Sequence, residues 1–205
     1  KYADASENVL EGIDLKVPVG SSVAIVGPVG SGKSSLILSL LGEAPLANGS
    51  VEFLNLPLGQ APRIAYVPQE AFVLNGSLRE NIAFGEKDVE FDFCTKVSCF
   101  EQDIKLFPKG LDTEIGEHGV NLSGGQKQRL GLARAAGSYP GLVLLDDPLS
   151  AVDVHTEDEL VEKLIFGHWE KTTRVVVTHR LKHLARFDQV VFIEDGKISA
   201  IGKYA

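Results

Sequence analysis

The sequence has few cysteines, no excess of positive charge and no long hydrophobic segment. Cys94 and Cys99 are the two cysteines among 205 residues, and no second pair completes a zinc site or a disulfide framework. We therefore expect two free thiols and a reducing compartment. The formal net charge of −8 argues against bulk binding to nucleic acid or anionic lipid, because both need a basic surface.

The apolar runs are too short to cross a bilayer, which needs roughly 18 residues. The longest are residues 142–145, 175–177 and 190–193. The chain opens on Lys1 and Tyr2 without a signal-peptide pattern, within a segment typical of a strand. We therefore expect an excised domain. Its 44% hydrophobic and 23% charged residues are ordinary for a globular protein.

Strand and helix patterns alternate along most of the chain, which predicts an α/β fold with a mostly parallel sheet. Ligands of such sheets bind beyond the carboxyl ends of the strands. Residues 23–26 are apolar throughout, as in a central strand covered on both faces. The other predicted strands are residues 13–17, 50–53, 63–67, 142–145 and 174–177 and a hairpin over 190–201. The predicted helices are residues 36–41, 126–136 and 156–166.

Residues 71–123 have a different character. Strand signals fade there, and polar helical stretches at 77–82 and 91–100 dominate. We expect a single domain over residues 1–205. Its core would comprise about 1–70 and 124–205, and a helical subdomain would be inserted at about 71–123.

Residues 27–34 read GPVGSGKS and match the phosphate-loop pattern G-x-x-x-x-G-K-[ST] in full. Glycines let main-chain N–H groups wrap phosphate oxygens, and the following helix N-terminus attracts negative charge. Lys33 would reach the β- and γ-phosphates, and Ser34 would bind Mg²⁺. A glycine-rich turn that only caps a helix is the alternative. The predicted nucleotide-binding residues here are Gly27, Pro28, Val29, Gly30, Ser31, Gly32, Lys33, Ser34 and Ser35.

A carboxylate follows the apolar run at 142–145. Asp146 at the carboxyl edge of a central strand would lie beside the phosphate loop, where it can hold Mg²⁺ through water. Asp147-Pro148 also fits a plain turn. The complete phosphate loop in the same chain favours the metal-binding role.

Residues 122–129, LSGGQKQR, resemble the signature sequence of ATP-binding-cassette (ABC) transporters. Ser123 can cap a helix whose N–H groups and dipole attract an anion, although a cap without a ligand fits the spacing equally well. The resemblance implies a RecA-like P-loop NTPase core. It also implies that the signature covers the γ-phosphate of ATP held by a second, head-to-tail nucleotide-binding domain. The signature residues are Ser123, Gly124, Gly125 and Gln126.

Four further residues resemble family motifs, in family order. Tyr2 is similar to the aromatic residue that stacks on adenine. Gln69 is similar to the Q-loop glutamine, which touches Mg²⁺ and the attacking water, in a region that contacts the transmembrane domains. Asp153 ends a segment, residues 150–153, that resembles the D-loop, which crosses to the partner domain. His179 resembles the switch histidine on the γ-phosphate.

Residues 66–85 and 144–153 resemble the first nucleotide-binding domain of the multidrug-resistance-associated, or C, subfamily of ABC exporters. The resemblance implies a domain at the cytoplasmic face of a membrane that couples ATP hydrolysis to export and binds no nucleic acid. It implies ATP and Mg²⁺ as cofactors. The implied metal ligands are Ser34, Gln69 and Asp146, and the implied catalytic residues are Asp147, His179 and Gln69.

One residue departs from the family pattern. Most active ABC ATPases have Glu directly after the metal-binding aspartate, and this chain has Asp147. The shorter side chain withdraws the carboxylate by about an ångström, and such a displacement can lower a rate about 10²-fold. We therefore expect this domain to bind ATP well and to hydrolyse it slowly.

Three other classes of protein share parts of the pattern. A DNA-repair or chromosome-maintenance ATPase head has a similar signature, but 90 positions without sustained heptads between Lys33 and Ser123 leave no room for its coiled coil. A P-loop kinase or GTPase would leave the signature unexplained, and no Asn-Lys-x-Asp is present. A regulatory nucleotide sensor with negligible turnover is compatible with Asp147.

Overall fold

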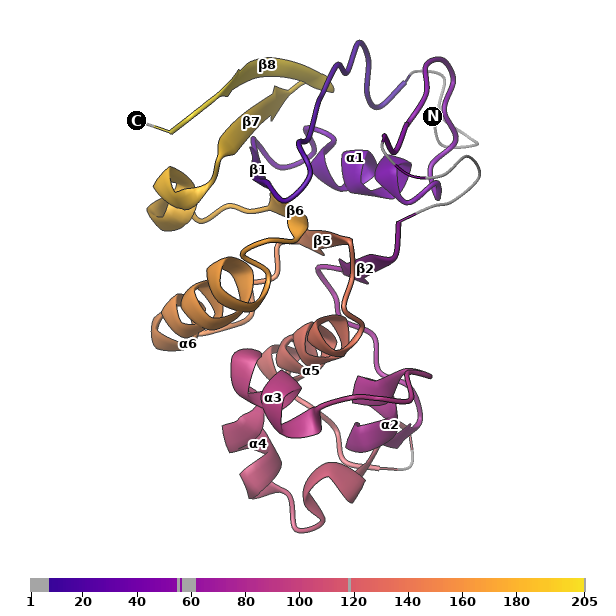
Figure 1. Ribbon diagram of the computed structural model, residues 1–205, viewed down its shortest axis with the longest axis vertical. Helices are drawn as coiled ribbons and strands as arrows, with labels where there is room; N and C mark the ends of the chain where they lie inside the picture. The colour runs from indigo at the N-terminus through magenta and orange to yellow at the C-terminus, as the bar shows by residue number, and fades with distance from the viewer. Residues whose placement is uncertain (1–7, 55, 57–61, 118, 205) are drawn as a thin grey trace.

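The computed structural model describes residues 8–54, 56, 62–117 and 119–204. Its centre is a six-stranded sheet in the order β2–β5–β6–β1–β7–β8 (Figure 1). Every neighbouring pair is parallel except the hairpin β7–β8. The strands are β1 (Ser22–Val26), β2 (Ile64–Val67), β5 (Leu142–Asp146), β6 (Thr173–Val177), β7 (Gln189–Glu194) and β8 (Lys197–Gly202). The prediction of a mostly parallel α/β sheet with an antiparallel part is confirmed.

Alternate side chains of the sheet belong to two separate cores. Ile25 and Val175 pack with Leu36 of α1 (Lys33–Leu40) on one face. Ala24 and Val176 share the other core with residues of α5 and η2, because successive strand side chains point to opposite faces. The helices of this second face are α5 (Gly124–Gly137), α6 (Val154–Leu160), its π-helical continuation η2 (Val161–His168) and the 3-10 helix η3 (Leu181–Arg186).

Two strand predictions, at residues 13–17 and 50–53, are wrong, since neither segment forms a strand in the structure. Both nevertheless have the predicted alternation of burial. Ile13, Leu15 and Phe53 pack against the core on the α1 face. Alternation thus predicted which side chains face inward. It does not predict whether a neighbouring strand is present, and a strand needs a partner for its main-chain hydrogen bonds as well as a buried face.

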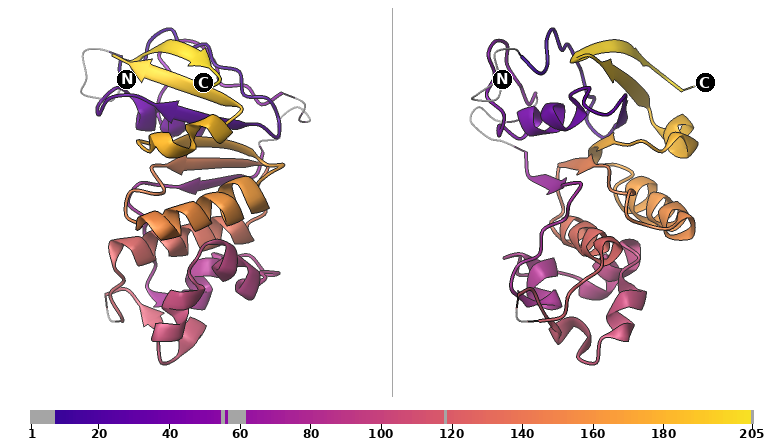
Figure 2. Two further views of the ribbon diagram at one scale, coloured as in Figure 1. Left: turned by 90° about the vertical axis from the view of Figure 1, so that its left-hand side faces the viewer. Right: turned by 180° about the vertical axis from the view of Figure 1, so that it is seen from behind.

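The chain between β2 and α5 forms the small helices at the lower end of the molecule, beside α5 (Figures 1 and 2). A two-stranded ribbon of β3 (Gly76–Ser77) and β4 (Glu114–Ile115) closes this segment. Its helices are α2 (Leu78–Ala83), α3 (Phe91–Val97), α4 (Glu101–Leu106) and the 3-10 helix η1 (Gly110–Asp112). Ser77 and Glu80 form a reciprocal capping box at the start of α2. That this segment behaves as a separate subdomain stays a prediction.

Cys94 and Cys99 are free thiols, as predicted. Cys94 is buried on α3, and the half-buried Cys99 thiol lies 3.7 Å from a carboxylate oxygen of Glu159. Burial raises the pKa of Cys99 to about 11, and the Glu159 charge adds to the effect while Lys163 opposes it. Cys99 is therefore a poor nucleophile at neutral pH.

We expect Cys99 to react with iodoacetamide about tenfold more slowly in the folded chain than in urea at about pH 8. A pKa of about 11 in place of 9.0 leaves about 100-fold less thiolate, and the greater nucleophilicity of a more basic thiolate recovers part of the loss. Trypsin cleaves after Lys96, so mass spectrometry follows the two cysteines separately. Equal rates in the folded and unfolded chain would contradict the burial argument.

Candidate functional site

The loop between β1 and α1 requires glycine at several positions. Gly27, Gly30 and Gly32 have φ angles of 153, 81 and 101°, which favour glycine. A Cβ atom on Gly27 would lie 2.0 Å from the Ile193 carbonyl oxygen, and one on Gly32 would lie 2.7 Å from the Leu10 side chain. Gly32 provides no side-chain cap for α1. The predicted phosphate loop is thus a tightly held main-chain turn that ends at an uncapped helix N-terminus, a common anion-binding arrangement.

A buried cation lies inside this loop. The Lys33 side chain is 6% exposed, and its Nζ donates to the carbonyl oxygens of Gly27 at 3.0 Å and Pro28 at 2.6 Å. Burial lowers the pKa of Lys33, while the charges of Asp146 and Asp147 oppose the shift. The hydroxyl oxygen of Ser31 is also buried, and it has no hydrogen-bond partner within the described part of the chain. The loop therefore presents polar groups that an anionic ligand can satisfy.

Two adjacent carboxylates lie at the carboxyl end of β5. Asp146 is the last residue of the strand, opposite Val177 of β6, and it is 6% exposed. Asp147 is buried as well, with a φ of 47° that Asp tolerates better than most residues, and its N–H donates to the Val177 carbonyl at 3.0 Å. Burial raises the pKa of the Asp147 carboxyl. This rise in pKa is opposed by the charges of His179 and Arg180 and by the main-chain N–H of His179. The charge of Asp146 adds to it.

The sheet topology places the remaining core candidates at the same edge. Gln69 follows β2, and His179 follows β6, each with an exposed side chain. Parallel strands end at one edge of a sheet, so both residues leave the sheet on the side of the phosphate loop and Asp146. The charge of His179 lowers the pKa of Asp147 and the charge of Asp146 raises the pKa of Lys33, which is consistent with this shared edge.

The donor set suits magnesium better than a metal held wholly by the protein. Across residues 8–54, 56, 62–117 and 119–204, no group of three or more His, Cys, Asp and Glu side chains is arranged to hold a metal ion. Mg²⁺ is usually bound by one or two carboxylates together with waters and substrate phosphates. Asp146, a buried carboxylate at the end of β5 beside the phosphate loop, fits that pattern.

The predicted signature caps α5. The main-chain N–H of Gln126 donates to the Ser123 hydroxyl at 3.3 Å, and the side-chain Oε1 of Gln126 accepts from the main-chain N–H of Ser123 at 2.9 Å. The Gln126 amide also donates to Asp103 at 3.2 Å, so its side chain is engaged within the chain. A Cβ atom on Gly125 would lie 2.8 Å from the Ala151 carbonyl oxygen. Ser123 and Gly124 are exposed, and they are the signature groups that face solvent.

A buried ion pair behind the signature was not predicted. Arg129 makes two hydrogen bonds to Asp103, at 2.7 and 2.9 Å, and the two side chains are 14% and 11% exposed. Asp103 thereby joins α4 to both Gln126 and Arg129 on the first turns of α5. One signal was present: Gln126 and Arg129 are three residues apart and share a helix face. Their acidic partner lies 26 positions from Arg129, where no local pattern indicates it.

We expect Asp103→Ala to lower the free energy of unfolding by about 2 kcal/mol, because it leaves the Arg129 guanidinium and the Gln126 amide without their acceptor in a largely buried place. The matched control is Asp112→Ala, which removes an exposed pair with Arg79 at 2.8 Å and should change stability little. Urea unfolding of the unaltered chain and both variants measures the difference. Equal losses in the two variants would contradict the importance of the buried pair.

The structure says less about the predicted roles of two further residues, Asp153 and Tyr2. The Asp153 carboxylate caps α6, accepting from the main-chain N–H groups of His155 and Thr156 at 3.1 Å and from the Thr156 hydroxyl at 2.6 Å. A contact between Asp153 and a second domain stays a prediction. Tyr2 lies outside the described residues, so its predicted role in stacking also stays a prediction.

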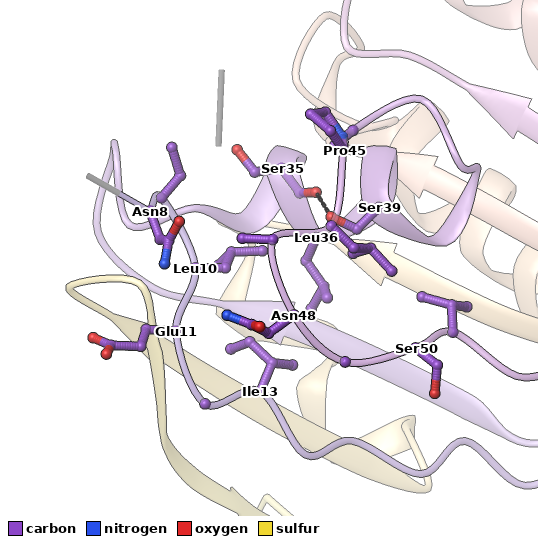
Figure 3. Close-up of a pocket in the computed structure, with 17 residues that line it drawn as sticks. Asn8, Leu10, Glu11, Ile13, Ser35, Leu36, Ser39, Pro45, Asn48 and Ser50 are labelled. Atoms are coloured by element: carbon purple, nitrogen blue, oxygen red, sulfur yellow. Dashed lines mark hydrogen bonds between the residues drawn. The ribbon is translucent and has the colours of Figure 1, made fainter. Parts of the chain in front are cut away.

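A pocket of about 340 Å³ lies beside α1 (Figure 3). It is lined by residues 8–13 and 44–51 and by Ser35, Leu36 and Ser39 of α1. The Ser39 hydroxyl donates to the Ser35 carbonyl at 2.8 Å within this wall. Of the predicted nucleotide-binding residues that the structure describes, Ser35 alone lines the pocket, and it lies two positions after Lys33. The pocket thus adjoins the helix turn that follows the phosphate loop.

Comparison with known proteins identifies the family. The sequence model of a family described as ABC transporter matches residues 10–150. The chain belongs to the ABC transporter family. ATP binding and an ATPase domain are properties of this family, and these two predictions are confirmed. The roles of the individual ABC motif residues stay predictions.

Relatives of the chain include long proteins of the C subfamily. The chain is 43% identical to "Multidrug resistance protein mrp-7" of Caenorhabditis elegans over 204 residues and 42% identical to "ATP-binding cassette sub-family C member 3" of Homo sapiens over 199 residues. It is 40% identical to "ABC transporter C family member 9" of Arabidopsis thaliana over 203 residues. The alignments cover 95–98% of this chain and 13% of each relative. The resemblance of this ABC domain to the C subfamily is confirmed.

None of the helices formed by the described residues is long and apolar enough to cross a bilayer.

Proposed function

We propose that this ABC domain binds Mg-ATP at the phosphate loop and couples ATP-driven dimerisation and hydrolysis to export by a C-subfamily transporter, at the cytoplasmic face of a membrane. One observation carries the proposal. A buried lysine, Lys33, lies within a glycine-constrained loop beside the buried carboxylates Asp146 and Asp147. A cation enclosed in this way is matched to an anionic ligand, and the carboxylates are matched to that ligand's metal ion.

Different residues would bind different parts of the magnesium triphosphate. Lys33 would exchange its two carbonyl acceptors, Gly27 and Pro28, for β- and γ-phosphate oxygens. Main-chain N–H groups at the start of α1 would bind the same phosphates. Ser34, Gln69 and Asp146 would hold Mg²⁺, which neutralises charge on the phosphates when it is bound. His179 would donate to the γ-phosphate from the end of β6.

We place the nucleoside of ATP in the pocket beside α1. The pocket shares Ser35 with the helix turn that follows the phosphate loop, and its volume of about 340 Å³ falls within the usual range for small-ligand sites. Apolar Leu10 and Leu36 and polar Asn8 and Asn48 line it, which suits an aromatic base attached to a hydroxylated sugar. Tyr2 would stack on the adenine from the segment that precedes this pocket.

Two surfaces support the proposed partners. The exposed Ser123 and Gly124 are available to cover ATP bound to a second, head-to-tail nucleotide-binding domain, with Asp153 at the same interface. Near Gln69, the exposed rings of Phe72 and Phe84 contact each other edge to face, with centroids 5.8 Å apart. The guanidinium of Arg134 stacks on both rings, and the exposed aromatic surface supports docking of the transmembrane domains beside the Q-loop. The net charge of −8 supports the absence of nucleic acid among the partners.

The hydrolytic role of this domain is proposed to be weak. Asp147 occupies the position of the family's glutamate, and its shorter carboxylate would hold the attacking water poorly. The resemblance to the first of two cassettes supports the same view, since the signature of this domain would then serve the ATP of a more active partner. The second candidate function, a regulatory nucleotide sensor with negligible turnover, is favoured by the same residue.

Calorimetry tests the proposal on the chain itself. We expect Mg-ATP to bind with a dissociation constant on the order of micromolar and AMP, which lacks the β- and γ-phosphates, to bind much more weakly. No heat of binding from ATP with Mg²⁺ present would overturn the proposed function. Titration with duplex DNA at several salt concentrations distinguishes this function from that of a DNA-repair ATPase. We expect no salt-dependent binding of DNA by this chain.

A further inference from the structure

The turn between β7 and β8 reaches the phosphate loop. Asp195 and Gly196 have φ angles of 47 and 72°, as in the two-residue turns that favour Asp-Gly in hairpins. The Gly196 N–H donates to the carbonyl oxygen of Ser31 at 3.2 Å. The Gly196 carbonyl accepts from the N–H of Glu11 at 2.9 Å. Both hydrogen bonds leave the hairpin, so the turn connects it to the phosphate loop and to the segment that lines the pocket.

The contact leaves no space for a side chain at Gly196. A Cβ atom there would lie 2.3 Å from the Val9 carbonyl oxygen. Strand β7 approaches the phosphate loop equally closely. A Cβ atom on Gly27 would lie 2.0 Å from the carbonyl oxygen of Ile193 in this strand. Main chain of β7 and of its turn therefore lies against the phosphate loop at its first glycine and at Ser31.

The hydrogen bond to Ser31 fixes the direction of the next main-chain amide of the phosphate loop. In a trans peptide the C=O of one residue and the N–H of the next point in opposite directions. No cis peptide bond occurs among the described residues. The Ser31 carbonyl points at the Gly196 N–H, and the Gly32 N–H of the same peptide therefore points away from the turn.

We propose that the Asp195-Gly196 turn positions the phosphate loop, and that Gly196 is a positioning residue for nucleotide binding. It holds the Ser31–Gly32 peptide so that the Gly32 N–H is directed at the phosphates before ATP arrives. The inference rests on the proposed binding of Mg-ATP at this loop. A purely local role in the hairpin accounts for the positive φ of Gly196. It accounts neither for the two hydrogen bonds outside the hairpin nor for the contact with Val9.

The test compares two glycine-to-alanine variants at similar positive φ angles, of which Gly196 is also crowded by neighbouring main chain. Gly85 has a φ of 90°, and a Cβ atom there would meet nothing within 4 Å. We expect Gly196→Ala to weaken Mg-ATP binding about tenfold, because one or two main-chain hydrogen bonds of the loop are lost or misdirected. Gly85→Ala should change the affinity less than about twofold, although both variants lose thermal stability through strain. Calorimetry and thermal unfolding are measured on the same preparations. Equal affinities of the two variants for Mg-ATP would overturn the proposal.

A second measurement uses the unaltered chain and needs no variant to fold. Amide NMR spectra are recorded with and without Mg-ATP. We expect the Gly196 amide to shift and its hydrogen exchange to slow when ATP binds, more than those of Gly202 at the far end of β8. Responses at Lys33 without one at Gly196 would overturn the positioning role. A lack of response at Lys33 and the rest of the loop would instead overturn ATP binding itself.

Discussion

Replacement of Lys33 by methionine is expected to weaken Mg-ATP binding about 100-fold and to leave the fold intact. Methionine keeps an unbranched side chain of similar length, so the variant removes the charge and the donors of Nζ and retains most of the packing. Hydrogen bonds to charged groups contribute up to about 3 kcal/mol each, which corresponds to roughly two orders of magnitude in affinity. Calorimetry with Mg-ATP measures the loss.

The stability of the same variant separates a binding defect from misfolding. Burial lowers the pKa of Lys33, which means that folding without ligand disfavours its charged form. Removal of this charge should therefore leave the thermal midpoint of the ligand-free chain unchanged or raise it, as expected where a functional site is kept at the expense of stability. The exposed Lys109→Met is the control and should alter neither property. Normal ATP affinity in Lys33→Met would contradict the proposed site.

The sequence predicted those parts of the site that depend on local pattern. The phosphate loop is one contiguous motif, and the apolar runs before Gly27 and Asp146 identified two central strands, because strands covered on both faces are apolar throughout. Parallel strands then bring their carboxyl ends to one edge. This rule placed Asp146 near the loop without any knowledge of strand order. Gln69 and His179 came from the resemblance to family motifs.

The features that the sequence did not predict depend on contacts between distant segments. Residues 13–17 have the alternation of a strand, yet pairing is decided by chain elsewhere. Asp103 is an ordinary polar residue on a short helix until α5 brings Arg129 against it. Gly196 matches a common hairpin turn, and its hydrogen bond to Ser31 spans 165 positions of the sequence. Local propensity contains no information about such pairings.

The second large expected effect concerns hydrolysis: Asp147→Glu should raise ATP turnover about 100-fold. The longer side chain would carry the carboxylate about an ångström closer to the attacking water, and a displacement of this size alters rates about 10²-fold. Phosphate release at saturating Mg-ATP is measured for both chains over a range of protein concentrations, because the proposed catalytic site is completed by the signature of a second domain.

The backbone conformation at Asp147 predicts a second effect of this substitution, on stability. Its φ of 47° lies in the left-handed region, where Asp is tolerated better than Glu. Asp147→Glu should therefore lower the free energy of unfolding by about 1 kcal/mol while it raises turnover. Asp147→Asn is the matched control, with the same length as Asp and no charge to accept a proton. If the unaltered chain hydrolyses ATP rapidly and Asp147→Asn abolishes that activity, Asp147 is already a competent base and the weak-hydrolysis proposal is wrong. If Asp147→Glu stays as slow as the unaltered chain even at high protein concentration, the shortened carboxylate does not limit turnover, and the regulatory-sensor function is favoured.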